Sequence, residues 1–368
     1  MTRNLVLFFD GTGNEVENNL TNVLKLYHCT LRDADQQVFY FPGVGTEPRA
    51  SDWGLWRQWM TKMRRARNMI TGWGFEKNII EAYCRVAREY REGDHIFIFG
   101  FSRGAYTARA VAGMIYLMGL LEPEQTNLAP YVFSAFKFSN IKNDLNIARN
   151  FRDVVGYRPI PIHFVGVWDT VKSVIRTFLP LRAVKLPYTN RNPSVRTFRQ
   201  AAAIDERRRL FPLSEWNEDE CKPDERSREP GEKQSQKTVW FAGTHVDVGG
   251  GSPENESQLS KIPLIWMTRE AQACGLRIDQ SLFSNIAEGT QLQGKKRHYP
   301  PDPLAPIHNS MNFIWWLMIP KPRKIENCSF VHSSVSERIK NSTYNPVNLR
   351  NVAYDIVEDT KQPANDAN

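Results

Sequence analysis

The sequence predicts an α/β protein: a mostly parallel sheet with helices on both faces and a helical or irregular cap. Short runs at 5–9, 96–99 and 160–168 are apolar at nearly every position and rich in β-branched and aromatic residues, which is typical of strands buried on both faces. Helical patterns at 21–31 and 76–91 separate these runs. This alternation favours parallel pairing, because parallel strands need a crossover connection.

The composition is that of a globular protein. The 368 residues are 41% hydrophobic and 24% charged, enough for one large core or two modest ones. The formal net charge of +8 favours an anionic partner, namely nucleic acid, acidic lipid headgroups or an acidic protein, but does not choose among them. The alternative is a generally basic soluble surface. The five cysteines are scattered and lack C-x-x-C spacing, so neither a disulfide framework nor a structural zinc site is indicated.

The apolar segments are too short for a signal peptide or a membrane span. Five consecutive apolar residues precede Asp10, and no segment approaches the roughly 20 apolar residues of a transmembrane helix. We expect the run at 313–319 to be buried core, with a lipid-contacting wedge as the alternative. The sequence therefore predicts cytoplasmic synthesis without a signal peptide; export would require a specialised secretion system.

The first predicted strand, 5–9, runs into DGTGN at 10–14, a glycine-rich turn typical of the active edge of an α/β sheet. Aspartyl phosphatases also have an Asp-Gly-Thr turn, but their nucleophile would fall on Phe8, so that chemistry lacks its carboxylate. We expect Asp10 to shape the turn. The next strand, 37–41, should end in a second glycine loop at the same edge.

Residues 50–77 combine tryptophans with many basic side chains and have no carboxylate between Asp52 and Glu76. Indoles favour the membrane interface and basic side chains attract acidic headgroups, so the segment suits a helix on an anionic membrane or a cover over a lipid-binding cleft. The alternative is a solvated basic face with the tryptophans in the core. The candidate membrane contacts are Trp53, Trp56, Trp59, Arg64 and Arg65.

The stretch 94–113 organises the predicted site. An apolar strand, the sequence G-x-S-x-G and a helix of small residues follow one another, which is the context of a nucleophile elbow in an α/β-hydrolase. Gly100 and Gly104 are expected there because a Cβ at either position would collide with the neighbouring strand or helix. Ser102 is therefore the predicted nucleophile; the alternative is an ordinary turn whose serine caps the helix.

Two later strand ends supply the partners that a serine nucleophile needs. A serine hydroxyl is nearly inert until a histidine takes its proton and a carboxylate orients that histidine. In α/β-hydrolases the chain order is Ser, then Asp or Glu, then His, and Asp169 and His245 follow the predicted strands 160–168 and 238–243. The rival candidates for these two roles are His332, Asp247 and Asp205.

The oxyanion of such a reaction needs backbone N–H donors. One is the N–H of the residue after the nucleophile, Arg103, and Gly11 or Thr12 is well placed to give the other. No cofactor is predicted. The sequence has no H-x-x-x-H pair, EF-hand loop or P-loop, so metal catalysis is not expected, while an ion near Asp10 or Asp247 stays open.

We expect residues 1–354 to form a single α/β-hydrolase domain. Its predicted cap insertions lie at about 50–75, 122–158 and 170–237, the last of which is rich in proline and arginine. Residues 355–368 are polar, and we expect them to be a disordered tail.

Seven motifs in order make the chain similar to a known family. They are FFDGTGN at 8–14, TNV at 21–23, GVGT at 43–46, GDHIFIFGFSRGAYTAR at 93–109, GVWDTV at 166–171, DERR at 205–208 and WFAGTHVDVGGG at 240–251. On these motifs the chain resembles the DUF2235 α/β-hydrolases, which include the catalytic domain of the Tle1-like type VI secretion phospholipase effectors. The resemblance covers about residues 4–340.

The resemblance implies hydrolysis of phospholipid or related carboxylic esters. The family's triad falls on Ser102, Asp169 and His245, the residues that strand order also selects. Two positions depart from the family pattern: Gln200, where a histidine is usual, and Val246, where a serine is usual, so fine specificity stays open. The best-known effectors also carry a large membrane-docking domain that this sequence lacks, so a toxin role does not follow from the resemblance.

The sequence thus predicts a serine lipase or phospholipase. The alternatives are a soluble esterase for small molecules and a non-enzymatic protein that binds nucleic acid or another anion on the same fold. The expected partners are a lipid or acyl-ester substrate and an anionic membrane surface, and the resemblance adds a secretion carrier or an immunity protein. Nucleic acid is the less favoured partner.

Overall fold

The computed structural model describes residues 2–11, 19–43, 73–141, 146–156, 158–171, 186–209, 211–217, 234–311 and 320–360. Several predictions fall outside these residues. They are the oxyanion role of Thr12, most of the basic tryptophan segment at 50–77 with its candidate membrane contacts and the cap insertion predicted there, and the burial of the apolar run at 313–319.

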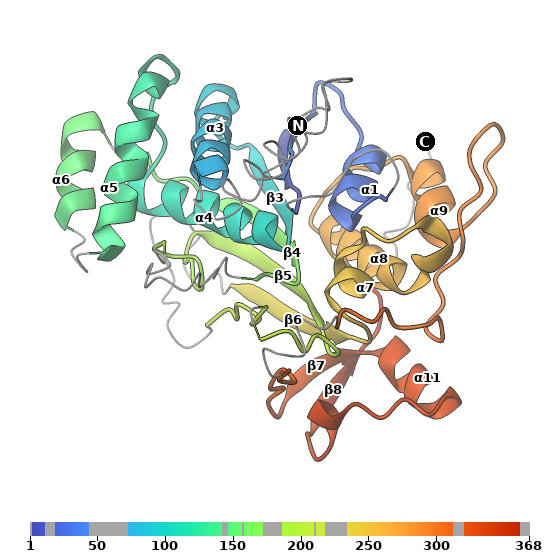
Figure 1. The fold of residues 1–368 in the computed structure, drawn as a ribbon. Coiled ribbons are helices and arrows are strands. Elements are labelled where there is room, and N and C mark those ends of the chain that lie inside the picture. Colours follow the sequence, from blue (N-terminus) through green and yellow to red (C-terminus); the bar gives the residue numbers. More distant parts are fainter. Residues whose placement is uncertain are drawn as a thin grey trace, which may run out of the picture.

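Eight strands in the described residues form one sheet in which every neighbouring pair is parallel (Figure 1). They are β1 (Asn4–Phe9), β2 (Gln36–Phe41), β3 (His95–Phe101), β4 (Ile162–Trp168), β5 (Val195–Ala203), β6 (Ser235–Phe241), β7 (Ser329–His332) and β8 (Tyr354–Val357). Their order across the sheet is β2-β1-β3-β4-β5-β6-β7-β8. The predicted fold class, an α/β-hydrolase-like parallel sheet, is confirmed.

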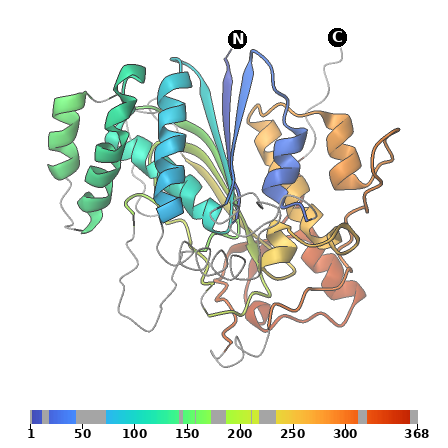
Figure 2. The same ribbon diagram turned by 45° about the horizontal axis from the view of Figure 1, so that its top comes forward.

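Helices cover both faces of the sheet (Figures 1 and 2). On one side lie α3 (Trp73–Glu89), α4 (Arg103–Met118), the 3-10 helix η1 (Pro123–Leu128), α5 (Ala129–Ile141) and α6 (Asn146–Val155). On the other side lie α1 (Asn22–Cys29), α7 (His245–Gly249), the 3-10 helix η2 (Glu254–Glu256), α8 (Gln258–Ala273) and α9 (Gln280–Glu288). In the described part of the chain no single helix is long and apolar enough to cross a membrane, although α4 and residues 123–139 meet that criterion together across a bend of 115°.

Strands β1, β3 and β4 are mostly apolar because both of their faces are buried. In β1, Leu7 and Phe9 join the core under α3 and α4, whereas Val6 and Phe8 join the core under α1 and α8. The ring of Phe8 stacks on that of Phe99 in β3, with ring centroids 5.0 Å apart. This two-sided burial explains the continuous apolar runs from which the strands were predicted.

Strand β5 corrects the prediction that 170–237 is a cap insertion. It pairs with β4 and β6 inside the sheet. Its sequence, VRTFRQAAA, lacks an apolar run because two of its buried polar side chains have partners on helices: Arg199 pairs with Glu270 of α8, and Gln200 accepts a hydrogen bond from Arg109 of α4 at 2.5 Å. The hydropathy of this segment does not indicate a buried strand, because the residues that pair with its polar side chains lie far away in the sequence.

Helices α5 and α6 fall in the predicted cap at 122–158, but they belong to the main core. Val132, Phe136 and Ala148 are buried in the same cluster as the residues of α3 and α4. These two helices therefore extend the layer on that side of the sheet.

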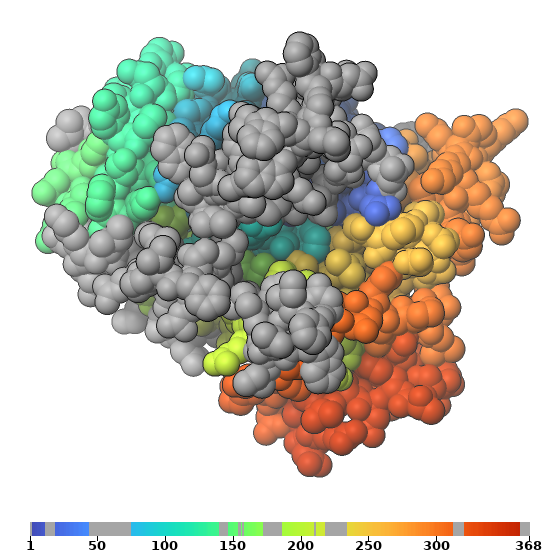
Figure 3. Space-filling view, in the orientation of Figure 1, coloured from blue at the N-terminus to red at the C-terminus, as the bar shows by residue number. Residues whose placement is uncertain are grey.

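The C-terminal residues add two strands to the sheet beyond β6. Helix α11 (Ser333–Asn341) and the 3-10 helix η3 (Val347–Leu349) connect β7 to β8, and Val331, Val335 and Trp240 share a small core there. Figure 3 shows this segment, in red, as a lobe at one end of the molecule. Because β8 pairs with β7 through Val357, the predicted disordered tail at 355–368 begins inside an ordered strand.

Candidate active site

Ser102 occupies the turn between β3 and α4 with a φ of +57°, a left-handed conformation that few non-glycine residues adopt. Its N–H donates to the carbonyl oxygen of Trp168 at 3.0 Å, which ties the turn to the end of β4. A Cβ on Gly100 would lie 2.6 Å from the Gly104 carbonyl oxygen, and a Cβ on Gly104 would lie 2.3 Å from the Phe9 carbonyl oxygen. The Ser102 side chain makes no hydrogen bond that caps α4, so helix capping does not account for this serine.

His245 connects Ser102 to Asp169. It opens α7 directly after β6, and its Nε2 lies 2.8 Å from the Ser102 hydroxyl while its Nδ1 lies 2.5 Å from Asp169 Oδ2. The rings of Phe101 and Phe211 flank the imidazole, with centroids 4.7 and 5.3 Å away. All three polar side chains are buried, so their mutual hydrogen bonds lie in a low-dielectric environment where they are strong.

Asp169 is held by donors on both of its oxygens. Its Oδ1 accepts from the Ala203 N–H at 2.9 Å, and the guanidinium of Arg323 donates to Oδ1 at 2.5 Å and to Oδ2 at 3.0 Å. Complete burial alone would raise the pKa of this carboxyl, but the charge of Arg323 and the hydrogen bonds from His245 and Arg323 hold the pKa well below its ordinary value. Asp169 is therefore ionised at neutral pH and accepts from the imidazole Nδ1–H.

Arg323 is absent from the predicted site. It lies 154 residues from Asp169 in sequence, in the irregular segment before β7. Neither a strand end nor a recognised motif marks it. The C-terminal fold alone brings it to Asp169.

The glycine turn after β1 departs from its predicted oxyanion role. The N–H of Gly11 donates to Asp10 Oδ1 at 2.6 Å, so it is not free for an oxyanion in this conformation. Asp10 Oδ2 accepts from the hydroxyls of Thr21 and Tyr40, each at 2.8 Å, and burial together with the Asp10 charge raises the pKa of Tyr40. Asp10 thus organises this turn. The N–H of Arg103 lies in the first turn of α4, where no carbonyl within the helix accepts it.

The rival histidine and one rival aspartate have other partners. His332 ends β7, and its Nδ1 lies 2.9 Å from the Ser334 hydroxyl at the start of α11. Asp205 accepts from the Tyr344 hydroxyl at 2.7 Å, and burial raises its pKa.

Asp247, the other rival aspartate, forms a capping box with Thr244 at the start of α7. It accepts from the N–H and the hydroxyl of Thr244 at 2.8 and 2.9 Å, and from His308 Nδ1 at 2.5 Å. Burial acts against protonation of His308, but Asp247 and Glu256 raise its pKa. Within the described ranges, no three His, Cys, Asp or Glu side chains are arranged to hold a metal ion.

Neither departure from the family pattern belongs to the hydrogen-bonded series. Gln200 accepts from the guanidinium of Arg109, whose pKa is lowered to about 9 by burial. Val246 is half-buried and follows His245 in α7.

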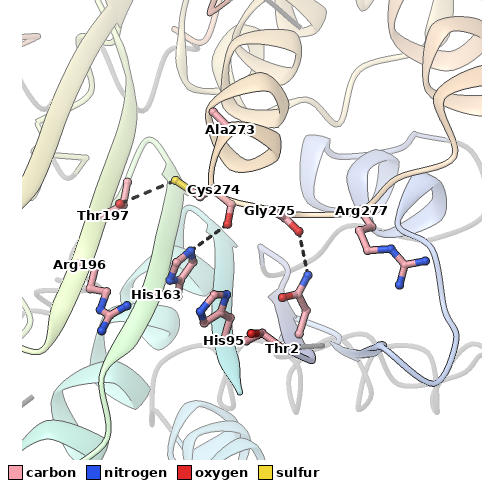
Figure 4. Close-up of a pocket in the computed structure, with 10 residues that line it drawn as sticks. Thr2, His95, His163, Arg196, Thr197, Ala273, Cys274, Gly275 and Arg277 are labelled. Carbon is pink, nitrogen blue, oxygen red and sulfur yellow. Dashed lines mark hydrogen bonds between the residues drawn. The ribbon is translucent and has the colours of Figure 1, made fainter. Parts of the chain in front are cut away.

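A separate pocket lies at the opposite edge of the sheet (Figure 4). It has a volume of about 470 Å³, and its lining includes Asn4 and His95, the first residues of β1 and β3, and Cys274 after α8. The rings of His95 and His163 stack there with centroids 3.8 Å apart. Because Ser102 follows the carboxyl end of its strand, this pocket is not part of the candidate active site.

A parallel sheet with helices on both faces and a serine at a sharp strand-to-helix turn defines the class, an α/β-hydrolase-like protein. The profile of one family, the type VI secretion system phospholipase effector Tle1-like catalytic domain, matches residues 3–270. The chain belongs to that family. Its membership supports lipase or phospholipase activity in general terms.

Other similarities are more distant. An uncharacterized protein of Saccharomyces cerevisiae, YEL023C, is 31% identical over 221 residues, which cover 57% of this chain and 32% of the yeast protein. A crystal structure of an uncharacterized protein from Pseudomonas aeruginosa is 21% identical, covers 76% of this chain and 47% of its own, and has a TM-score of 0.41. A structure of the Tle1 effector bound to the VgrG spike of the type 6 secretion system is 18% identical, covers 70% and 53%, and has a TM-score of 0.37. The chain spans about a third to a half of the length of these proteins.

Proposed function

We propose that the protein is a serine hydrolase that cleaves the carboxylic esters of phospholipids. The observation that carries the proposal is the hydrogen-bonded series from Asp169 through His245 to Ser102 at the carboxyl edge of the sheet. Family membership supports a lipid substrate.

The proposed reaction proceeds through an acyl-enzyme. The Ser102 hydroxyl oxygen attacks the acyl carbonyl carbon while His245 Nε2 takes the hydroxyl proton, and Asp169 stabilises the imidazolium that forms. The N–H of Arg103 donates to the developing oxyanion. His245 then gives its proton to the leaving alcohol oxygen, and a water molecule, deprotonated by the same imidazole, releases the fatty acid and restores Ser102.

The decisive experiment is product analysis on a mixed phospholipid panel with wild-type protein beside Ser102→Ala. We expect the variant to fold normally and to lose on the order of 10⁴-fold or more in hydrolysis, because the nucleophilic oxygen is gone. His332→Ala is the matched control, since His332 lies outside the series and its loss should leave turnover intact. Retained hydrolysis in Ser102→Ala would refute the proposed mechanism.

Further measurements separate the alternatives. Co-sedimentation with liposomes, with and without acidic lipid, distinguishes an enzyme acting at a membrane surface from a soluble esterase for small molecules. Salt-dependent binding of nucleic acid without fluorophosphonate labelling of Ser102 would favour a non-enzymatic protein. A secretion carrier or an immunity protein is a further proposed partner, because the family is one of type VI secretion effectors.

A further inference from the structure

The guanidinium of Arg323 makes a buried, two-pronged contact with Asp169. Besides its two hydrogen bonds to the carboxylate, Nη1 donates to the Ala203 carbonyl oxygen at 3.1 Å and Nη2 to the Phe211 carbonyl oxygen at 2.9 Å. Arg323 is only 9% exposed. Four acceptors therefore fix the planar guanidinium against Asp169, whose Oδ2 contacts both Arg323 and His245.

We propose that Arg323 is a positioning residue of the proposed triad, which holds the Asp169 carboxylate toward His245 and offsets part of its negative charge. The inference rests on the proposed function. Arg323 lies beyond residues 3–270, so the part of the chain that matches the family profile does not contain it.

Orientation is the first consequence of this contact. A carboxylate can rotate about its Cβ–Cγ bond, and a bidentate guanidinium fixes both oxygens in one plane. Oδ1 accepts from Arg323 and from the Ala203 N–H, while Oδ2 accepts from Arg323 and faces His245 Nδ1. The imidazole is thereby held with Nε2 toward Ser102.

Charge is the second consequence. An uncompensated carboxylate beside an imidazole raises the affinity of that ring for a proton, and a cation behind the carboxylate lowers it. Each carboxylate near His245 has a cationic or protonatable partner in the described residues. The pairs are Asp169 with Arg323, Glu206 with Arg208, and Asp247 with His308.

Loss of Arg323 alone would leave one of these carboxylates unbalanced. His245 would then stay protonated to a higher pH and could not act as a base there. The acid limb of the pH–rate profile should move to higher pH, by on the order of one unit, because one charge that contacts the same carboxylate as His245 is lost.

The test compares three variants of the full chain. Arg323→Gln removes the charge, Arg323→Lys keeps it without the two-pronged geometry, and Arg338→Gln is the matched control. Arg338 is an equally buried arginine of the same C-terminal lobe, and it donates to the carbonyl oxygens of Pro303 and Ala305, not to the triad. The readouts are kcat/KM for ester hydrolysis and the rate of fluorophosphonate labelling of Ser102, each across pH.

We expect Arg323→Gln to shift the acid limb upward by about one pH unit, and Arg323→Lys to keep the limb near that of the wild type while kcat falls about tenfold. Arg338→Gln should lower stability without moving the limb. An unshifted limb in Arg323→Gln, or an equal shift in Arg338→Gln, would overturn the proposal.

If Arg323→Gln does not fold, the lysine variant decides, because a wild-type kcat and profile there would refute the positioning role. Failure of the proposed function is recognised separately. It would appear as retained activity in Ser102→Ala, whatever the arginine variants do.

Discussion

The packing of Gly104 against β1 allows a sharp test of how the turn positions Ser102. A Cβ at Gly104 would lie 2.3 Å from the Phe9 carbonyl oxygen, whereas Cβ contacts below 3.0 Å are essentially never observed. In Gly104→Ala the start of α4 and the end of β1 must therefore separate by at least about 0.7 Å, the difference between these two distances. Ser102 lies two residues before this contact and must move with the helix.

Two effects on stability oppose each other in Gly104→Ala. Overpacking costs about 1–3 kcal/mol, and alanine regains up to about 1 kcal/mol over glycine inside a helix. The net loss of stability is thus small to moderate. The effect on turnover is larger, since a displacement of about 1 Å in a catalytic group can cost on the order of 100-fold.

The matched control is Gly113→Ala in the same helix. Its Cβ would lie 2.7 Å from the Pro187 carbonyl oxygen, so it also overpacks, but against a loop far along α4 from the turn. Ester hydrolysis per folded molecule and denaturant unfolding should be measured for both variants. Equal turnover in Gly104→Ala and Gly113→Ala at equal stability would refute the view that the glycine contact sets the serine position.

Two further predictions concern buried charge. Asp169→Asn leaves the Arg323 guanidinium without its counter-charge and should lower the free energy of unfolding by about 3–5 kcal/mol. The double variant Asp169→Asn with Arg323→Met removes the unpaired charge and should regain part of that stability. Strictly additive losses of the two single variants in denaturant melts would contradict this. Because Asp169 has a depressed pKa when folded, despite its burial, its stabilising effect is complete above about pH 4 and is lost as the pH falls through the folded value. Lys25 is fully buried, and its Nζ has no hydrogen-bond partner in the described part of the chain. Burial lowers its pKa from 10.5 to about 8, so wild-type stability should rise with pH across that interval. Lys25→Met should be more stable by about 1–3 kcal/mol at pH 7 and should lack this rise; an unchanged or lower melting temperature would count against the reasoning.

Three of the predicted strands have side chains that are apolar at most positions because the strands are buried on both faces. β1, β3 and β4 are apolar on both faces, so hydropathy alone locates them. β5 is equally internal, but Arg199 and Gln200 are balanced by Glu270 and Arg109. Such a strand can be recognised only when the helix residues that pair with its polar side chains are known.

The same distinction applies to the candidate site. Ser102, Asp169 and His245 are predictable because each follows a strand, and the carboxyl ends of parallel strands meet at one edge. Arg323 follows no strand, and its place depends on the path of the C-terminal lobe. The donor assigned to Gly11 failed for a local reason, since the adjacent Asp10 side chain takes its N–H.

From β3 onward, the order of strands across the sheet is the order along the chain. On a ribosome, each new strand can therefore add to the edge of the sheet already formed, without waiting for a later one. Asp169 is then the exception, because its counter-charge emerges 154 residues later. At ordinary rates of elongation this delay is roughly 8–30 s, during which the nascent chain has its serine turn but Asp169 lacks its arginine partner.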